Sequence, residues 1–206
     1  MAVDEYIERI SKLDSSAISD ALDSLSLRGV VTRLKPLTVQ KKIYGRAVTV
    51  KLVPKGTNVT SNRHLGTAAV EAASKGDVIV VEHCMDDVAG WGGNLSIAAK
   101  QKEIGGVIIS GACRDIDEIR ELDFPVYASA AVPTTARGRI VEESFNEEIT
   151  IDQISVCPGD LVLADGSGIV FIPIQHADEV LTAAERIVEN EGEMANAIRE
   201  GTPVSL

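Results

Sequence analysis

The sequence has few cysteines and few aromatic residues. Its three cysteines, Cys84, Cys113 and Cys157, are widely spaced and form no Cys-x-x-Cys pair. This odd number and spacing argue against a disulfide framework and a zinc site, so we expect reduced thiols, with Cys113 packed in a strand. Aromatic residues make up only 3% of the chain, too few for platforms on which nucleic-acid bases stack.

Basic residues are also in the minority. The chain has 20 lysines and arginines against 31 aspartates and glutamates, a formal net charge of −11. This balance argues against sequence-independent binding to nucleic acid, which requires basic patches. The sequence also lacks a long apolar run, a basic leader followed by an apolar segment, and a lipidation signature. We therefore expect a cytoplasmic protein with neither a nucleic-acid nor a membrane partner.

The apolar content is high enough for a sizeable core. With 206 residues, 45% of them hydrophobic, we expect a single domain over residues 1–206. Helices and strands are both predicted, which indicates an α/β fold with central strands covered by helices; an ordinary doubly wound sheet is the alternative. The expected helices are 4–13, 15–25 with Ser15 or Ser16 as its cap, 62–74 and 177–199, and the expected strands are 45–53, 78–82, 107–109, 126–128, two within 141–156 around Asn146, 161–164 and 169–172.

A glycine-rich loop followed by a helix occupies the start of the central segment, Gly90 to Pro125. Gly92 and Gly93 allow the backbone to approach a ligand closely, and Asn94 is suited to cap the helix that follows. A loop of this kind presents unpaired N–H groups at a helix N-terminus, where anions bind favourably.

An arginine and an aspartate follow the next strand. Residues 107–109 are uniformly β-branched, as in a strand buried on both faces, and Arg114 and Asp115 come just past its carboxyl end. A guanidinium matches a carboxylate or keto-acid, and a carboxylate suits a hard divalent cation. With the amide loop, the pair predicts a site for a small oxo-acid chelated to a metal. The segment alone does not exclude a helix cap with a surface ion pair.

Four further groups carry side chains of the kinds found in metal or catalytic sites: Asp20 with Asp23, His64, His83 with Asp86 and Asp87, and Asp165. For the aspartate pair we favour a solvated helix surface, and for the isolated His64 a surface or capping position on a helix. For Asp165 we favour a turn before glycine. His83 and its two neighbours either border the pocket or form a solvated loop.

The spacing of the central residues resembles a family signature. Gly93, twenty intervening residues and Arg114-Asp115-x-x-Glu118 are similar to the signature of the class II pyruvate aldolases of the 4-hydroxy-4-methyl-2-oxoglutarate aldolase family. That family also contains the regulator of ribonuclease activity A. The likeness extends over nearly the whole chain and includes Ser19–Asp23, Gly45–Val50, Gly76–Val78, Phe124–Val126, Pro158–Asp160 and the Glu-rich last helix.

The resemblance implies a swivelling β/β/α-type fold, assembly as trimers or dimers of trimers, and roles for the site residues. The substrate carboxylate would be held by the backbone of four residues, Gly92, Gly93, Asn94 and Leu95. Arg114 would contact the keto oxygen, and Asp115 would anchor Mg²⁺ or Mn²⁺. Glu118 would orient a group next to the metal, and Glu191 would approach the metal from a neighbouring subunit.

The resemblance also implies a reaction. We expect a metal-dependent lyase that cleaves 4-hydroxy-4-methyl-2-oxoglutarate, or a related 4-substituted 2-oxo-acid, to pyruvate and also decarboxylates oxaloacetate. Both reactions pass through a pyruvate enolate, whose charge a divalent cation stabilises as a Lewis acid. The alternative is a non-catalytic, protein-binding regulator of ribonuclease activity; the intact Arg114-Asp115 pair favours the enzyme. A methyltransferase is disfavoured because no glycine-rich first-strand loop is followed by the expected acidic residue.

Overall fold

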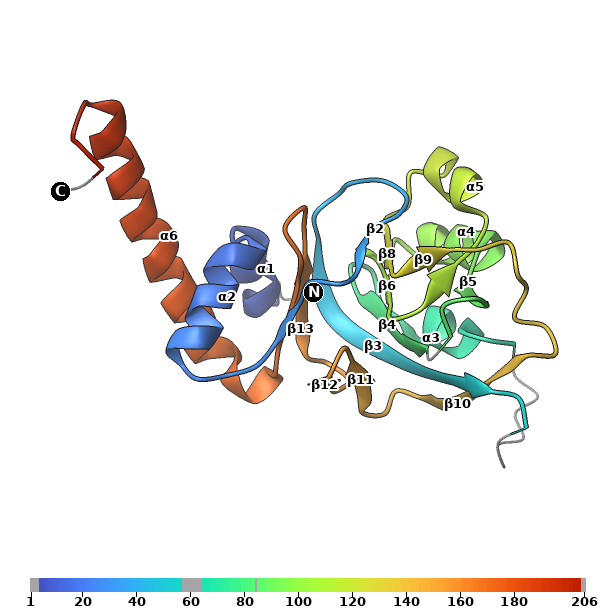
Figure 1. The fold of residues 1–206 in the computed structure, drawn as a ribbon. Coiled ribbons are helices and arrows are strands. Elements are labelled where there is room, and N and C mark those ends of the chain that lie inside the picture. The colour runs from blue at the N-terminus through green and yellow to red at the C-terminus, as the bar shows by residue number, and fades with distance from the viewer. Residues whose placement is uncertain (1–3, 57–63, 84, 205–206) are drawn as a thin grey trace.

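A mixed sheet runs through the protein in the computed structural model, which describes residues 4–56, 64–83 and 85–204 (Figure 1). Its strands are β1 (Val30–Val31), β2 (Lys35–Pro36), β3 (Ile43–Pro54), β4 (Val78–His83), β6 (Gly106–Ile109), β8 (Val126–Ala128), β10 (Ile140–Phe145), β13 (Leu161–Ala164) and β14 (Ile169–Ile172). They are ordered β1-β14-β13-β3-β4-β6-β8-β2, and β10 pairs with β3. The neighbours β3, β4, β6 and β8 are parallel, whereas the remaining pairs are antiparallel.

Three short helices cover one face of the parallel strands. They are α3 (Thr67–Ala72), α4 (Gly93–Gln101) and α5 (Ile116–Glu121), and they lie together beside β4, β6 and β8 in Figure 1. Alternate strand residues such as Val81 and Ile109 pack in one cluster with helical residues such as Ala99 and Ile119. This is the arrangement expected when a strand is followed by a helix and a parallel strand.

Strands, not helices, cover the other face. Val80, Ile108 and Tyr127 pack against residues of the hairpin β11 (Ile149–Ile151) and β12 (Ile154–Val156) and of β13 and β14, including Phe171. The α/β class with covered central strands is confirmed, and the layers follow the β/β/α order. The doubly wound alternative is wrong because it requires helices on both faces.

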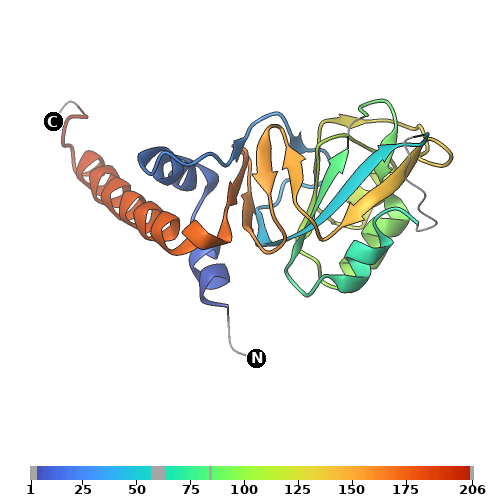
Figure 2. The same ribbon diagram turned by 90° about the horizontal axis from the view of Figure 1, so that it is seen from below.

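A third cluster lies on the outer side of β13 and β14. Leu163 and Ile172 pack there against α1 (Glu5–Ser11), α2 (Ser15–Ser24) and the first half of α6 (Ala177–Arg199). The second half of α6 extends away from the sheet in Figures 1 and 2. Within the described ranges, no helix is both long and apolar enough to cross a membrane.

Several predicted boundaries differ from the observed ones. The second helix is capped by Asp14, whose carboxylate accepts from Ala17 N at 2.9 Å, and not by Ser15 or Ser16. Region 140–156 contains three strands, β10, β11 and β12, with Asn146 in the left-handed conformation after β10. The helix expected over 62–74 is shorter; residues 62 and 63 lie outside the described ranges.

Cys113 is packed in a strand, as expected. Its side chain is fully buried in β7 (Ala112–Cys113), and this burial raises the thiol pKa to about 12. A thiol with so high a pKa is a packing group and a poor nucleophile at neutral pH. Cys84 lies outside the described residues.

Asp165 joins α2 to the turn between β13 and β14. Its carboxylate accepts from Ser15 N at 2.8 Å, from Ser15 Oγ at 2.7 Å and from Ser167 N at 2.9 Å. These bonds satisfy the first turn of the helix and confirm the turn role favoured for this residue.

We expect Asp165→Ala to lower the free energy of unfolding by about 1–3 kcal/mol, because the buried residue Ser15 then has donors without partners. Urea denaturation followed by circular dichroism measures the change. Ser167→Ala is the control: only its backbone N–H is used, so its effect should stay within about 0.5 kcal/mol. Equal denaturation midpoints for Asp165→Ala and wild type would contradict the structural role.

Candidate functional site

A small parallel sheet places the two halves of the central segment side by side. It consists of β5 (Ala89–Trp91), β7 and β9 (Ala130–Ala131), in the order β5-β7-β9. Arg114 N donates to Trp91 O at 3.1 Å, directly after this pairing. The loop that starts α4 and the residues that start α5 therefore meet at one edge.

Asp115 links the two helix starts. Its backbone has φ of 58°, the left-handed conformation, and its Oδ2 accepts from Gly93 N at 3.0 Å and from Arg114 Nε at 3.1 Å. Arg114 Nη1 and Nη2 and Asp115 Oδ1 have no partner among the described residues. The two side chains are 39% and 34% exposed, so their ion pair contributes little stability. The pair is thus held in place yet accessible to a ligand.

The carboxylates of Asp115 and Glu118 approach two glycines of the loop closely. A Cβ on Gly92 would lie 2.9 Å from Asp115 Oδ2, and one on Gly93 would lie 2.4 Å from Glu118 Oε2. The helix α4 begins at Gly93 with Gly92 as its cap and without a side-chain cap, so the capping role predicted for Asn94 is wrong. Asn94 is instead an exposed residue in the first turn.

A cavity of about 340 Å³ opens in front of this pair. It is lined by His64, Leu65, Ala89, Gly90, Trp91, Gly92, Gly93, Asn94, Leu95, Arg114, Asp115, Thr135, Ala136, Arg137, Ile140 and Val141. All six residues predicted to hold substrate or metal line it. His64 is exposed, which confirms the surface position favoured for it, but it precedes α3 and is not helical; it also lines the cavity.

Sequence reasoning missed one wall of the cavity. Thr135, Ala136 and Arg137 belong to the segment between β9 and β10, and Ile140 and Val141 start β10. No local signal marks Arg137, because an exposed arginine in a loop is ordinary. These residues share a cavity with the glycine loop because β10 pairs with β3, a contact between distant segments of the chain.

Two other hollows, of about 540 and 350 Å³, lie elsewhere. The first has Glu71 as its single charged lining residue. The second contains Arg28 and Asp160, and the Asp160 carboxylate already accepts from Cys157 N and Ile174 N. Neither combines free amides, a guanidinium and a carboxylate, so chemistry rather than size selects the smaller cavity.

Trp91 fixes the wall of the cavity. Its ring is 2% exposed, and its Nε1 donates to Ser96 Oγ at 2.8 Å, which itself donates to Gly92 O at 3.0 Å. Gly66 packs against the ring, and its N–H donates to the buried carboxylate of Glu142 at 2.8 Å. These contacts hold the glycine loop rigidly, as a binding site requires.

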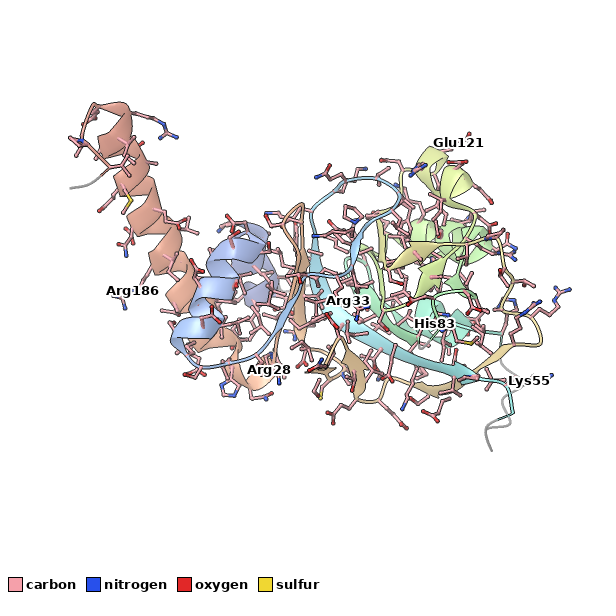
Figure 3. All side chains as sticks on the ribbon, viewed as in Figure 1. Arg28, Arg33, Lys55, His83, Glu121 and Arg186 are labelled. Atoms are coloured by element: carbon pink, nitrogen blue, oxygen red, sulfur yellow. The ribbon has the colours of Figure 1, made fainter. Side chains whose placement is uncertain are left out.

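His83 lies beneath the loop. Its ring is 3% exposed, inside the fold in Figure 3, and a Cβ on Gly90 or Gly111 would lie 3.0 or 2.3 Å from it. His83 Nε2 lies 2.6 Å from Val88 O. Because a carbonyl oxygen can only accept a hydrogen bond, Nε2 carries the proton and donates it to Val88. The buried Nδ1 has no partner among the described residues. His83 is thus neither a pocket border nor part of a solvated loop.

The other candidates lie outside the cavity. Asp86 accepts from Ser129 Oγ at 2.6 Å, and Asp20 and Asp23 are exposed on α2. Glu191 is exposed on α6 and does not line the cavity of its own chain.

The residues at Asp115 fit a magnesium-type cation. Among the described residues, no three His, Cys, Asp or Glu side chains form a metal-binding cluster. Mg²⁺ does not require one, since it keeps several waters and is bound by one or two carboxylates and by substrate oxygens. Asp115 Oδ1 is available for this purpose, and the Glu118 carboxylate lies nearby, against Gly93.

Comparison with known families identifies the chain. Residues 15–171 match the RraA-like family, described as Aldolase/RraA. The chain belongs to the RraA-like family. The resemblance inferred from the Gly93 to Glu118 spacing is therefore confirmed.

Relatives of this RraA-like protein have different names. It is 31% identical over 187 residues to a Halalkalibacterium halodurans protein named "Putative 4-hydroxy-4-methyl-2-oxoglutarate aldolase", covering 88% of this chain and 83% of that protein. It is 28% identical over 197 residues to protein DlpA of Legionella pneumophila, covering 95% of this chain but 32% of DlpA. The chain thus spans about a third of DlpA.

Solved structures share the fold. An uncharacterized protein from Pseudomonas syringae has a TM-score of 0.86 at 27% identity, covering 98% of this chain and 96% of that one. The RNA-processing inhibitor RraA from Thermus thermophilis has a TM-score of 0.62 at 26% identity, covering 76% and 92%. The family thus includes proteins named for two kinds of activity.

The buried histidine generates a pH prediction. Burial lowers the pKa of His83, opposed by the hydrogen bond to Val88 and the carboxylates of Asp86 and Asp87. As the pH falls below about 7, His83 therefore binds a proton in the unfolded chain before it does so in the folded protein. The free energy of unfolding falls over this range by up to about 1.4 kcal/mol per pH unit.

His83→Gln removes the titration and keeps an N–H donor for Val88 O. We expect the free energy of unfolding of wild type to fall more steeply than that of the variant between pH 7.5 and 5.5, measured by urea denaturation at each pH. Parallel curves would show that His83 is not held neutral by the fold.

Proposed function

We propose that this protein is a divalent-metal-dependent carbon–carbon lyase that releases pyruvate from 4-hydroxy-4-methyl-2-oxoglutarate or a related 4-substituted 2-oxo-acid, and from oxaloacetate by decarboxylation. One observation carries the proposal: a single cavity gathers the N-terminus of α4, the Arg114 guanidinium and the Asp115 carboxylate. The name of the Halalkalibacterium halodurans relative supports it.

The amides of α4 would bind the substrate carboxylate. Gly93 N already donates to Asp115, so the N–H groups of Asn94 and Leu95, which have no partner among the described residues, are the donors in question. A helix N-terminus favours negative charge through these amides and the helix dipole. The carboxylate would therefore lie over the first turn, next to Arg114.

Arg114 would stabilise the keto oxygen. Its Nε is bound to Asp115, which fixes the plane of the guanidinium and leaves the two terminal nitrogens for the substrate. Cleavage of the bond next to the keto group moves negative charge onto that oxygen. A cation held in position beforehand stabilises this charge more in the transition state than in the ground state.

Asp115 would hold the cation. Gly93 N–H and Arg114 Nε fix Oδ2 and leave Oδ1 as a ligand for Mg²⁺ or Mn²⁺. When bound, the divalent cation supplies Lewis-acid polarisation of the keto group. Glu118 would orient groups next to the cation from its position beside Gly93.

A non-catalytic regulator of ribonuclease activity is the second candidate, favoured by the similarity to the Thermus RraA structure. The accessible Arg114 and Asp115 pair favours the enzyme, because a protein-binding regulator has no need of a charged cavity. We further propose a cytoplasmic homotrimer or hexamer; Met194 and Ile198, exposed on the projecting half of α6, support association.

The first test measures pyruvate release from oxaloacetate and from 4-hydroxy-4-methyl-2-oxoglutarate, with Mg²⁺ and with excess chelator. We expect chelator-sensitive release and a loss of at least about 100-fold in kcat/KM for Asp115→Asn. Asparagine tolerates the left-handed backbone of position 115, so the variant loses the charge and keeps the fold.

Asp117→Asn is the matched control. Asp117 is 93% exposed in α5 and pairs with Arg120, and it does not line the cavity, so full activity is expected. If wild type releases pyruvate from neither substrate, the lyase proposal is wrong and the regulator remains. If Asp115→Asn retains full activity, Asp115 does not hold the metal.

Arg114→Gln should lower kcat/KM by about 100-fold or more, the scale of losing one preorganised electrostatic donor. The loss should appear mainly in kcat, because the guanidinium acts on charge that develops during the reaction. Arg186→Gln is the control and should be unaffected, because Arg186 is an exposed residue of α6 that does not line the cavity and lies on the other side of the molecule from Glu121 of α5 in Figure 3. An unchanged kcat would assign Arg114 a purely structural role.

A further inference from the structure

The cavity contains a second arginine that the proposed chemistry does not use. Arg114, Asp115 and Arg137 are its lining residues with permanent charge, giving the cavity a local charge of +1 in a chain whose net charge is −11. Because the surrounding protein is acidic, this local excess of positive charge is a specific feature of the cavity. It favours an anionic ligand with more than one negative group.

Arg137 lines the same cavity as the glycine loop but comes from a different segment of the chain, just before β10. Its backbone N–H donates to Thr135 Oγ1 at 3.2 Å, and its guanidinium has no partner among the described residues. Arg114, in contrast, is tied to Asp115. In the same loop Arg139 donates to Thr135 O at 3.0 Å and does not line the cavity.

We propose that Arg137 binds the distal carboxylate of the substrate, so that the site selects 2-oxo-diacids over 2-oxo-monoacids. This inference rests on the proposed function, which anchors the 2-oxo-acid end at α4 and Arg114. The far end of the ligand then faces the wall containing Ala136, Ile140 and Val141, where Arg137 supplies the cationic group.

The dimensions and chemistry of the cavity agree with this assignment. A volume of about 340 Å³ is at the small end of ligand pockets, so a short diacid can contact lining residues from both segments. A guanidinium fork pairs with a carboxylate through two parallel hydrogen bonds. The terminal methyl of a monoacid would leave that fork without a partner.

The test uses two acids that differ only at the distal end. 2-Oxoglutarate and 2-oxopentanoate have the same length and the same 2-oxo-acid head, and they end in a carboxylate and a methyl group. Neither has a 4-hydroxyl group, so neither undergoes aldol cleavage and binding is measured directly. Trp91, the only tryptophan of the chain, lines the cavity, and its fluorescence in the presence of Mg²⁺ reports binding.

We expect wild type to bind 2-oxoglutarate at least about tenfold more tightly than 2-oxopentanoate. In Arg137→Gln the two dissociation constants should become nearly equal through weaker binding of 2-oxoglutarate alone. Arg139→Gln, two residues along the same loop, should keep the wild-type ratio.

Equal affinities for both acids in wild type, or an unchanged ratio in Arg137→Gln, would overturn the assignment of Arg137 and leave the lyase proposal intact. Binding of neither acid would instead count against the 2-oxo-acid site itself and thus against both. Loss of 2-oxopentanoate binding in Arg137→Gln would assign the arginine to the wall of the cavity and overturn its role in selectivity.

Discussion

The bonds that Asp115 accepts from Gly93 and Arg114 hold the site together. The left-handed backbone of Asp115, unfavourable by roughly 1–2 kcal/mol for most residues, directs its carboxylate back toward α4. An aspartate offsets part of this cost through its own hydrogen bonds. The same carboxylate orients Arg114. Asp115 thus fixes the N-terminus of α4, the Arg114 guanidinium and its own Oδ1 relative to each other.

These bonds depend on a buried foundation beneath the glycine loop. Gly90 and Gly111 let the loops lie on the neutral ring of His83, and the pairing of β5 with β7 adds backbone hydrogen bonds above it. Trp91 and Ser96 then close the loop around Gly92. Because tightly packed interiors resist displacement, the polar groups at the surface of this foundation stay in position without a ligand.

Local signals predicted much of this arrangement, and long-range packing determined the rest. The strand 107–109, the helix 177–199 and the residues Arg114 and Asp115 are marked by periodicity, length or spacing. Two features were not predicted. The adjacent serines Ser15 and Ser16 drew attention away from Asp14 as the helix cap. The apolar sequences of β4 and β6 indicate burial on both faces of the sheet, but they do not show that strands cover one face. Arg137 reaches the cavity only through the pairing of β10 with β3, which no local pattern encodes.

The contrast between an acidic protein and a positively charged cavity has a physical consequence for ligand capture. At physiological ionic strength, surface charges are screened beyond about 8 Å, so the many distant carboxylates repel an incoming anion only weakly. The charges within the cavity act at shorter range and beside a largely apolar wall, where screening is less effective. In the proposed function, affinity for an organic anion would therefore be set by Arg114, Arg137 and the amides of α4, and only weakly by the net charge of −11.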